Sequence, residues 1–179
     1  MVHQNVLTFW FDELTQRQWW RVDPDLDAQI ACRFGALWDQ ARRGELHDWR
    51  QVAYGRLAEV IVLDQFSRNV HRNTPHAFSQ DAIALVLAQE AVAAGALEVL
   101  SPVECSFLLM PYMHSESLRI HQAAQPLFAA YTPPETQDYE RRHKAIVERF
   151  GRYPHRNAIL DRPSTDAERA FLEQPGSRF

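Results

Sequence analysis

Helix start signals and apolar residues at helical spacing recur along most of the chain. Asp23 followed by Pro24 pairs a capping residue with proline at the first helical position, and residues 101–104 and 165–168 are capping boxes. Between Asp23 and Gly44 the apolar residues fall three and four positions apart, as on one face of a helix. No segment keeps the alternation of polar and apolar residues that is typical of a β-strand. The sequence therefore predicts an all-α fold.

The same signals set the bounds of the expected helices. We expect Asn5 to cap the first helix, Gly95 to close the fourth, and Pro111 to break or kink the fifth. Short connections and the lack of a clear boundary predict a single domain over residues 1–179 with seven to eight helices. The expected helices cover residues 6–14, 24–44, 52–70, 75–94, 102–111, 115–131, 135–150 and 165–173.

The composition excludes several classes of protein. A formal net charge of −4 gives no global attraction to nucleic acid or to acidic membranes. Cys32 and Cys105 have neither metal nor redox spacing, and the first residues lack the pattern of a signal peptide. No window approaches the ~20 apolar residues that a membrane span needs. We therefore expect a soluble cytoplasmic protein without nucleic-acid or membrane partners, whose oligomeric state the sequence does not indicate.

Charged residues interrupt the apolar face of the third expected helix. The apolar face of residues 57–61 continues directly into Asp64 and Arg68, and Gln65 and Asn69 form a neighbouring polar pair. A charge on a core-facing stripe is nearly always paired, because a lone buried charge is costly. Either Asp64 pairs with an arginine, or these groups line a cavity.

A second group of candidate residues follows Pro111. Histidine as a residue type titrates near neutral pH, so His114 is a candidate general base, with Glu116 as the residue expected to orient it. The spacing of His114 and Glu116 lacks the downstream cysteine pair of a zinc deaminase, and no other histidine completes a ligand set. The chain also has no phosphate-binding glycine loop and no dinucleotide fingerprint. We therefore predict no metal and no cofactor.

The third group lies in residues 150–157, where a helix must end. Gly151 is placed as a left-handed C-cap, and Pro154 fixes its own φ and keeps the preceding residue extended. The resulting turn presents His155, Arg156 and Asn157 from a short loop. Arg156 is, with Arg68, a candidate partner for the buried carboxylate of the third helix. We predict that the three groups meet in space.

These motifs together carry a resemblance to a known family. Residues 64–69 (DQFSRN), 113–116 (MHSE) and 150–157 (FGRYPHRN) resemble a bacterial family catalogued as domain-of-unknown-function family 924, nearly from end to end. The resemblance implies a tetratricopeptide-like α-α superhelical arrangement and no established activity. The chain departs from the family at Asn73 and Asp161, where relatives tend to have glycine, which puts the local loop geometry in doubt.

Two functions remain open at this stage, and the sequence does not decide whether the protein is an enzyme. In the first, a polar pocket binds a small anionic molecule and carries out hydrolase-like or lyase-like chemistry. In the second, a tetratricopeptide-like scaffold binds a protein or a peptide carboxylate, and the same cluster is a structural network. For the pocket, the candidate catalytic residues are Asp64, His114, Glu116 and His155, and the candidate ligand-binding residues are Gln65, Arg68, Asn69, Arg72, Arg152, Arg156 and Asn157.

Overall fold

The computed structural model describes residues 2–177, and its regular structure is helical, with no strand in that range. The predicted all-α class is therefore confirmed. The α-helices are α1 (Val2–Leu7), α2 (Gln16–Trp19), α3 (Pro24–Arg42), α4 (Ala53–Ile61), α5 (Ser67–Val70), α6 (Asp81–Ala93), α7 (Pro102–Met113), α8 (Leu118–Tyr131), α9 (Pro134–Phe150) and α10 (Asp166–Leu172). Thr8–Glu13 and Val62–Phe66 are π-helical turns, and His47–Gln51, Pro75–Phe78, Ala96–Glu98 and Pro154–Arg156 are 3₁₀ turns.

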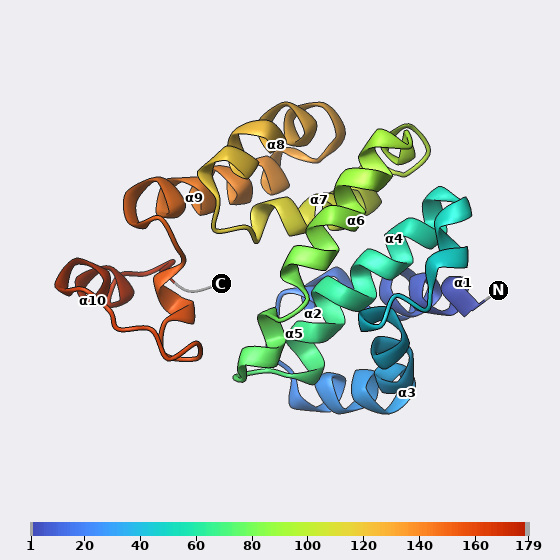
Figure 1. Cartoon of the computed structure of the whole chain (residues 1–179), viewed down its shortest axis with the longest axis horizontal. Helices are drawn as coiled ribbons and strands as arrows, with labels where there is room; N and C mark the ends of the chain where they lie inside the picture. The colour runs from blue at the N-terminus through green and yellow to red at the C-terminus, as the bar shows by residue number, and fades with distance from the viewer. Residues whose placement is uncertain (1, 178–179) are drawn as a thin grey trace.

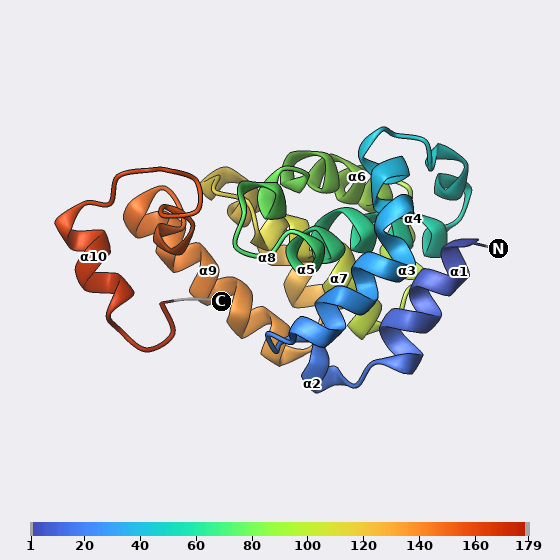
Figure 2. The same cartoon turned by 90° about the horizontal axis from the view of Figure 1, so that it is seen from below.

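Helix α4 packs against α1, α6 and α7. Helix α3 packs against α5 and the π-helical turn before it, while α8 packs on α7 and α9 packs on α8. Figures 1 and 2 show α1 to α6 gathered in one half of the molecule and α10 at the opposite end. A tetratricopeptide-like superhelical arrangement of these helices stays a prediction.

The apolar side chains form one large core and one small one. The large core contains the buried faces of α3, α4, α6 and α7, together with Phe9, Trp10 and Phe66 of the two π-helical turns. The small core is separate and consists of Ile146, Val147 and Tyr153, with partly buried side chains packed around it. The C-terminal segment, which we define as residues 151–177, therefore has little apolar contact of its own with the large core.

Several of the expected helix ends agree with the structure, and others do not. Both capping boxes form, at Ser101 and at Thr165, and Gly95 and Gly151 adopt the left-handed conformation that ends a helix. The prediction that Asn5 caps the first helix is wrong, because α1 already begins at Val2. Pro111 does not end its helix either, since α7 runs on to Met113 with every residue from 105 to 113 buried.

The expected third helix is interrupted by the π-helical turn Val62–Phe66, which joins α4 to α5. All five side chains of this turn are buried, including those of Asp64 and Gln65. A π-helical turn inserts one extra residue into the helix. Adjacent side chains that an α-helix would point in different directions can then both face the interior. Such turns are frequent at functional sites. This turn is the element that directs a carboxylate and an amide into the interior.

Asn73 and Asp161, where the resemblance leads us to expect glycine, are the two described non-glycine residues with positive φ. Asn73 has φ = 61° and Asp161 has φ = 51°. Glycine adopts this left-handed conformation without strain, and asparagine and aspartate are the side chains that tolerate it best. Both loops therefore hold a backbone conformation that suits glycine, at the cost of some backbone strain.

Candidate functional site

The carboxylate of Asp64 lies at the centre of a polar cluster built by three distant segments. His114 Nδ1 lies 2.7 Å from Asp64 Oδ1, and the side chain of Asp64 is fully buried. Gln65 donates to the other carboxylate oxygen at 2.5 Å, and Arg68 Nη1 lies 3.1 Å from Oδ1. Of the two arginines expected as candidate partners of Asp64, Arg68 therefore makes the contact. The sequence did not reveal that His114 is the second partner.

We call Asp64 and His114 the dyad. The charges around Asp64 set the protonation states of both side chains. Burial alone would raise the pKa of Asp64, but Arg68 and His114 together hold that pKa well below its ordinary value. Burial lowers the pKa of His114, and the positive charge of Arg68 lowers it further. At neutral pH the dyad is therefore a carboxylate that accepts from the Nδ1–H group of a neutral imidazole.

Asp81, the first residue of α6, joins the arginines of two segments. Arg68 donates to both oxygens of Asp81, at 2.9 and 3.1 Å, and Arg156 Nη1 donates to Oδ2 at 3.1 Å. Arg156 also donates to the backbone oxygen of His114 at 3.0 Å. The three predicted groups therefore meet, as expected. We call Asp64, Arg68, Asp81, His114 and Arg156 the polar cluster.

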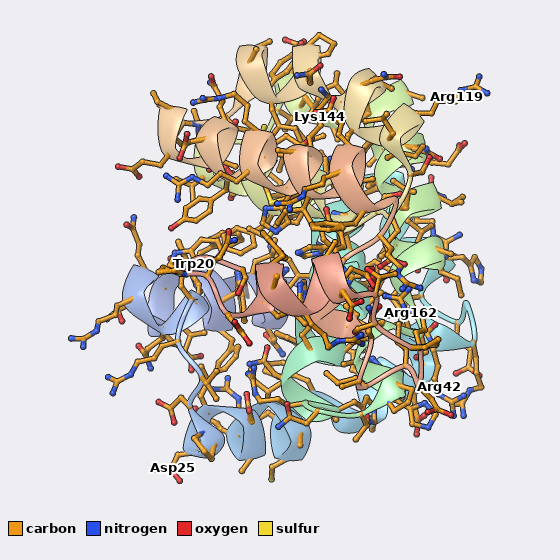
Figure 3. All side chains as sticks on the ribbon, turned by 90° about the vertical axis from the view of Figure 1, so that its left-hand side faces the viewer. Trp20, Asp25, Arg42, Arg119, Lys144 and Arg162 are labelled. Carbon is orange, nitrogen blue, oxygen red and sulfur yellow. The ribbon has the colours of Figure 1, made fainter. Side chains whose placement is uncertain are left out.

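Glu116 does not orient His114, which corrects the role expected for it. Its carboxylate accepts from the backbone N–H group of Tyr153 at 2.7 Å and from Arg162 at 2.7 and 2.9 Å. Figure 3 shows Arg162 on the C-terminal segment, at the end of the molecule that faces the viewer. Glu116 thus fastens the C-terminal segment to the end of α7, and its hydrogen bonds lie outside the polar cluster.

Tyr153 and a buried histidine form a second network beside the polar cluster. The Tyr153 hydroxyl donates to the backbone oxygen of Met113 at 2.5 Å and lies 3.1 Å from His121 Nε2. His121 Nδ1 lies 2.7 Å from Glu140, whose pKa is raised by burial. The side chains of Tyr153 and His121 are fully buried, so this network positions the C-terminal segment and does not face solvent.

The remaining candidate residues lie outside the polar cluster. Arg72 and Asn69 both bind Asp27 of α3, at distances from 2.5 to 2.8 Å. Arg152 binds Glu168 at 2.7 and 2.9 Å. The structure therefore does not bring these predicted ligand-binding residues together with Arg68 and Arg156.

Two further candidates lie within the C-terminal segment itself. Asn157 donates to Ser164 Oγ and accepts from Arg162, both at 3.1 Å, so its amide holds the loop after the 3₁₀ turn. His155 packs beside the ring of Tyr153, and burial lowers its pKa to about 3. His155 is therefore neutral at physiological pH, and its expected catalytic role remains a prediction.

The polar cluster is balanced in charge. Arg68 and Arg156 offset Asp64 and Asp81 when His114 is neutral. Two surface hollows, of about 290 and 380 Å³, lie elsewhere, the first beside Arg33 and the second beside Tyr139. Within residues 2–177, no helix has the length and apolar character to cross a bilayer, and no three His, Cys, Asp or Glu side chains gather as metal ligands would.

Comparison with known proteins agrees with this architecture. The family model of DUF924, described as a bacterial protein of unknown function, matches residues 6–176. The chain belongs to the DUF924 family. The DUF924 chain is also similar to a solved structure of the protein of unknown function ATU0120 from Agrobacterium tumefaciens. The two share 33% identity and a TM-score of 0.91, over 96% of this chain and 97% of that one. No curated protein matches the chain.

Proposed function

We propose that the polar cluster is an acid–base site for a small anionic molecule, with chemistry of the hydrolase or lyase type. The observation that carries this proposal is the dyad. A buried, ionised Asp64 accepts from His114 Nδ1, which fixes the imidazole tautomer and leaves the lone pair at Nε2. Nε2 makes no hydrogen bond with any residue in the described range, and 16% of the His114 side chain is exposed to solvent.

The chemistry follows from the states of these two side chains. A neutral imidazole whose Nδ1–H group is held by a carboxylate can accept a proton from the substrate with the lone pair of Nε2. Asp64 then stabilises the imidazolium that forms. The lowered pKa of His114 keeps it in the basic form at neutral pH. Arg68 retains 20% side-chain exposure and supplies the positive charge that an acidic substrate group would meet.

Substrate depletion in a mixture of small anionic metabolites, followed by mass spectrometry, tests this proposal. We expect the wild-type protein to consume a compound with a carboxylate or phosphate group, and His114→Gln to slow that reaction by about 10²-fold or more. His76→Gln, at an exposed histidine, is the control and should leave the rate unchanged. A His114→Gln variant that turns over the same compound at the wild-type rate contradicts the proposal.

A peptide-binding scaffold is the second candidate function, and two observations favour it. The charges of the polar cluster cancel, as in a purely structural network. Trp20 is 62% exposed and stacks on Tyr139, which is 49% exposed, so an aromatic surface is available for a peptide. In this case Trp20→Ala removes binding of the peptide, while His114→Gln has no effect on it.

A further inference from the structure

Two arginines from distant parts of the chain converge on one carboxylate, that of Asp81. Arg68 binds both oxygens of Asp81 and Arg156 binds one of them, across 13 and 75 positions of sequence respectively. A pair of guanidinium groups around one carboxylate is the arrangement by which proteins bind carboxylate and phosphate ligands. In this protein an internal side chain occupies that arrangement.

The arginine pair is held in place by contacts that do not depend on Asp81. The guanidinium carbon of Arg156 lies 4.6 Å from the ring centre of Phe78 and 4.7 Å from that of Tyr153. Arg156 also donates to the backbone oxygen of His114, and Arg68 donates to the backbone oxygen of Asp64 at 2.8 Å. Removal of the Asp81 carboxylate therefore leaves both guanidinium groups anchored where they are.

Arg156 has a hydrogen-bond donor to spare. The Arg156 side chain is 7% exposed, and its Nε atom is buried without an acceptor in the described part of the chain. A buried donor with no partner is costly, because it gives up its hydrogen bond to water without gaining another. A phosphate or carboxylate ligand offers acceptor atoms that the single Asp81 side chain does not supply.

We propose that Arg68 and Arg156 form an oxyanion-binding subsite, and that Asp81 occupies the place of a ligand's carboxylate or phosphate group. The inference rests on the proposed function, because it names where the acidic group of the substrate binds. Asp81 is the first residue of α6 and its side chain is 18% exposed, so the carboxylate lies where solvent and subsite meet. A ligand displaces it by rotation of one short side chain.

The position of this subsite also limits the substrate. Arg68 Nη1 contacts Asp64 Oδ1, and the same oxygen accepts from His114. The acidic group of the substrate therefore binds next to the imidazole. The reacting proton of the substrate therefore lies only a few bonds from its carboxylate or phosphate group.

Rescue of Asp81→Ala by added anions tests the subsite in the intact protein. We expect this variant to lose stability in chloride and to regain it on addition of formate or inorganic phosphate at about 10 mM, because an anion that binds only the folded state raises the melting temperature. Phosphate should bind the variant about tenfold or more tightly than it binds the wild type, since Asp81 no longer competes.

Asp27→Ala is the matched control. Asp27 lies in the first turn of α3, is 15% exposed and is held by Arg72 and Asn69, so it resembles Asp81 in burial and pairing but engages a single arginine. We expect no anion-specific recovery in this variant at equal ionic strength, and none in Asp81→Ala combined with Arg156→Gln. An Asp81→Ala response equal to that of Asp27→Ala overturns the proposal.

The two variants test the two proposals separately, because Asp81→Ala is followed by its folding and His114→Gln by its turnover. For an Asp81→Ala protein that does not fold in chloride, recovery of the folded protein by phosphate supports the subsite, and failure to recover it overturns the proposal. Turnover that is unchanged in His114→Gln contradicts the acid–base function even when Asp81→Ala binds phosphate. Loss of turnover in His114→Gln without any anion rescue contradicts the subsite alone.

Discussion

His114 Nδ1 lies 2.7 Å from Asp64 Oδ1, although the two residues are 50 positions apart in the sequence. The contact joins the π-helical turn after α4 to the residue directly after α7, and both elements have buried side chains in the large core. The core packing therefore determines the geometry of the dyad. A substitution at either residue is felt in the stability of the whole molecule as well as in the site.

Asp64→Ala should destabilise the protein by about 3–5 kcal/mol at pH 7, because removal of one member of a buried ionic network leaves its partners without an acceptor. The partners are the Nδ1–H group of His114, the amide of Gln65 and part of Arg68. Urea unfolding measures the change. Asp166→Ala removes an exposed ion pair and is expected to alter stability little. A loss below about 1 kcal/mol for Asp64→Ala would show that the network is not tightly coupled.

Acid should destabilise the protein well before its carboxylates are protonated, because buried histidines resist protonation. Burial lowers the pKa of His143 from 6.5 to about 3. Between these two pH values the unfolded chain binds a proton that the folded chain excludes, so stability falls as the pH falls through this window. The slope for one such group is about 1.4 kcal/mol per pH unit.

The test of this pH dependence is a series of urea unfolding experiments from pH 7 to pH 4. His143→Gln should reduce the slope by the share of one histidine, since glutamine has no proton to gain in the unfolded state, while His155 keeps its own share. His47→Gln, at an exposed histidine, should leave the slope as in the wild type. An unchanged slope in His143→Gln would assign the acid sensitivity to other groups.

Local sequence signals predicted the helices because the interactions that start a helix lie within a few residues. The side chains of Ser101 and Thr165 each accept from the backbone three residues later, as the capping boxes indicated. The failures came where tertiary packing overrides a local signal. Asn5 lies inside α1, and the buried packing around Pro111 keeps α7 helical past the proline.

The candidate site was predictable only in part, for a similar reason. A charge on an apolar helix face marked Asp64 as a residue with a buried partner, since burial of a lone charge is costly. Nothing in the sequence marked Asp81, because an aspartate in the first turn of a helix is common for its effect on the helix dipole. Arg162, which binds Glu116, was hidden in the same way, since only the folded chain brings the two residues together.

Asp161→Gly should stabilise the protein by about 0.5–1 kcal/mol, because glycine adopts positive φ without the strain that a side chain brings. Asp161 has φ = 51° and is exposed, so the substitution removes no buried contact. Gly151→Ala is the reverse change at φ = 70° and should destabilise by about 1 kcal/mol. Thermal unfolding measures both. A loss of stability in Asp161→Gly would mean that the carboxylate makes a contribution beyond its backbone.

Arg152→Ala should release the end of the C-terminal segment without affecting anion binding. Arg152 holds Glu168 of α10 with two hydrogen bonds and also donates to the backbone oxygen of Pro163 at 2.9 Å. The Glu168 side chain is 3% exposed, so it depends on this partner. We expect faster amide hydrogen exchange in α10, with exchange in α4 and α7 unchanged.

The control for this release is Arg169→Ala, which removes an arginine of the same helix whose partner Asp166 is exposed. Exchange in α10 should then stay close to that of the wild type, because exposed ion pairs contribute little. Phosphate binding to the Asp81→Ala protein distinguishes Arg152 from Arg156. Binding should persist when Arg152→Ala is added and disappear when Arg156→Gln is added. If Arg152→Ala abolished phosphate binding to the Asp81→Ala protein, the subsite would extend to the C-terminal segment as the sequence first suggested.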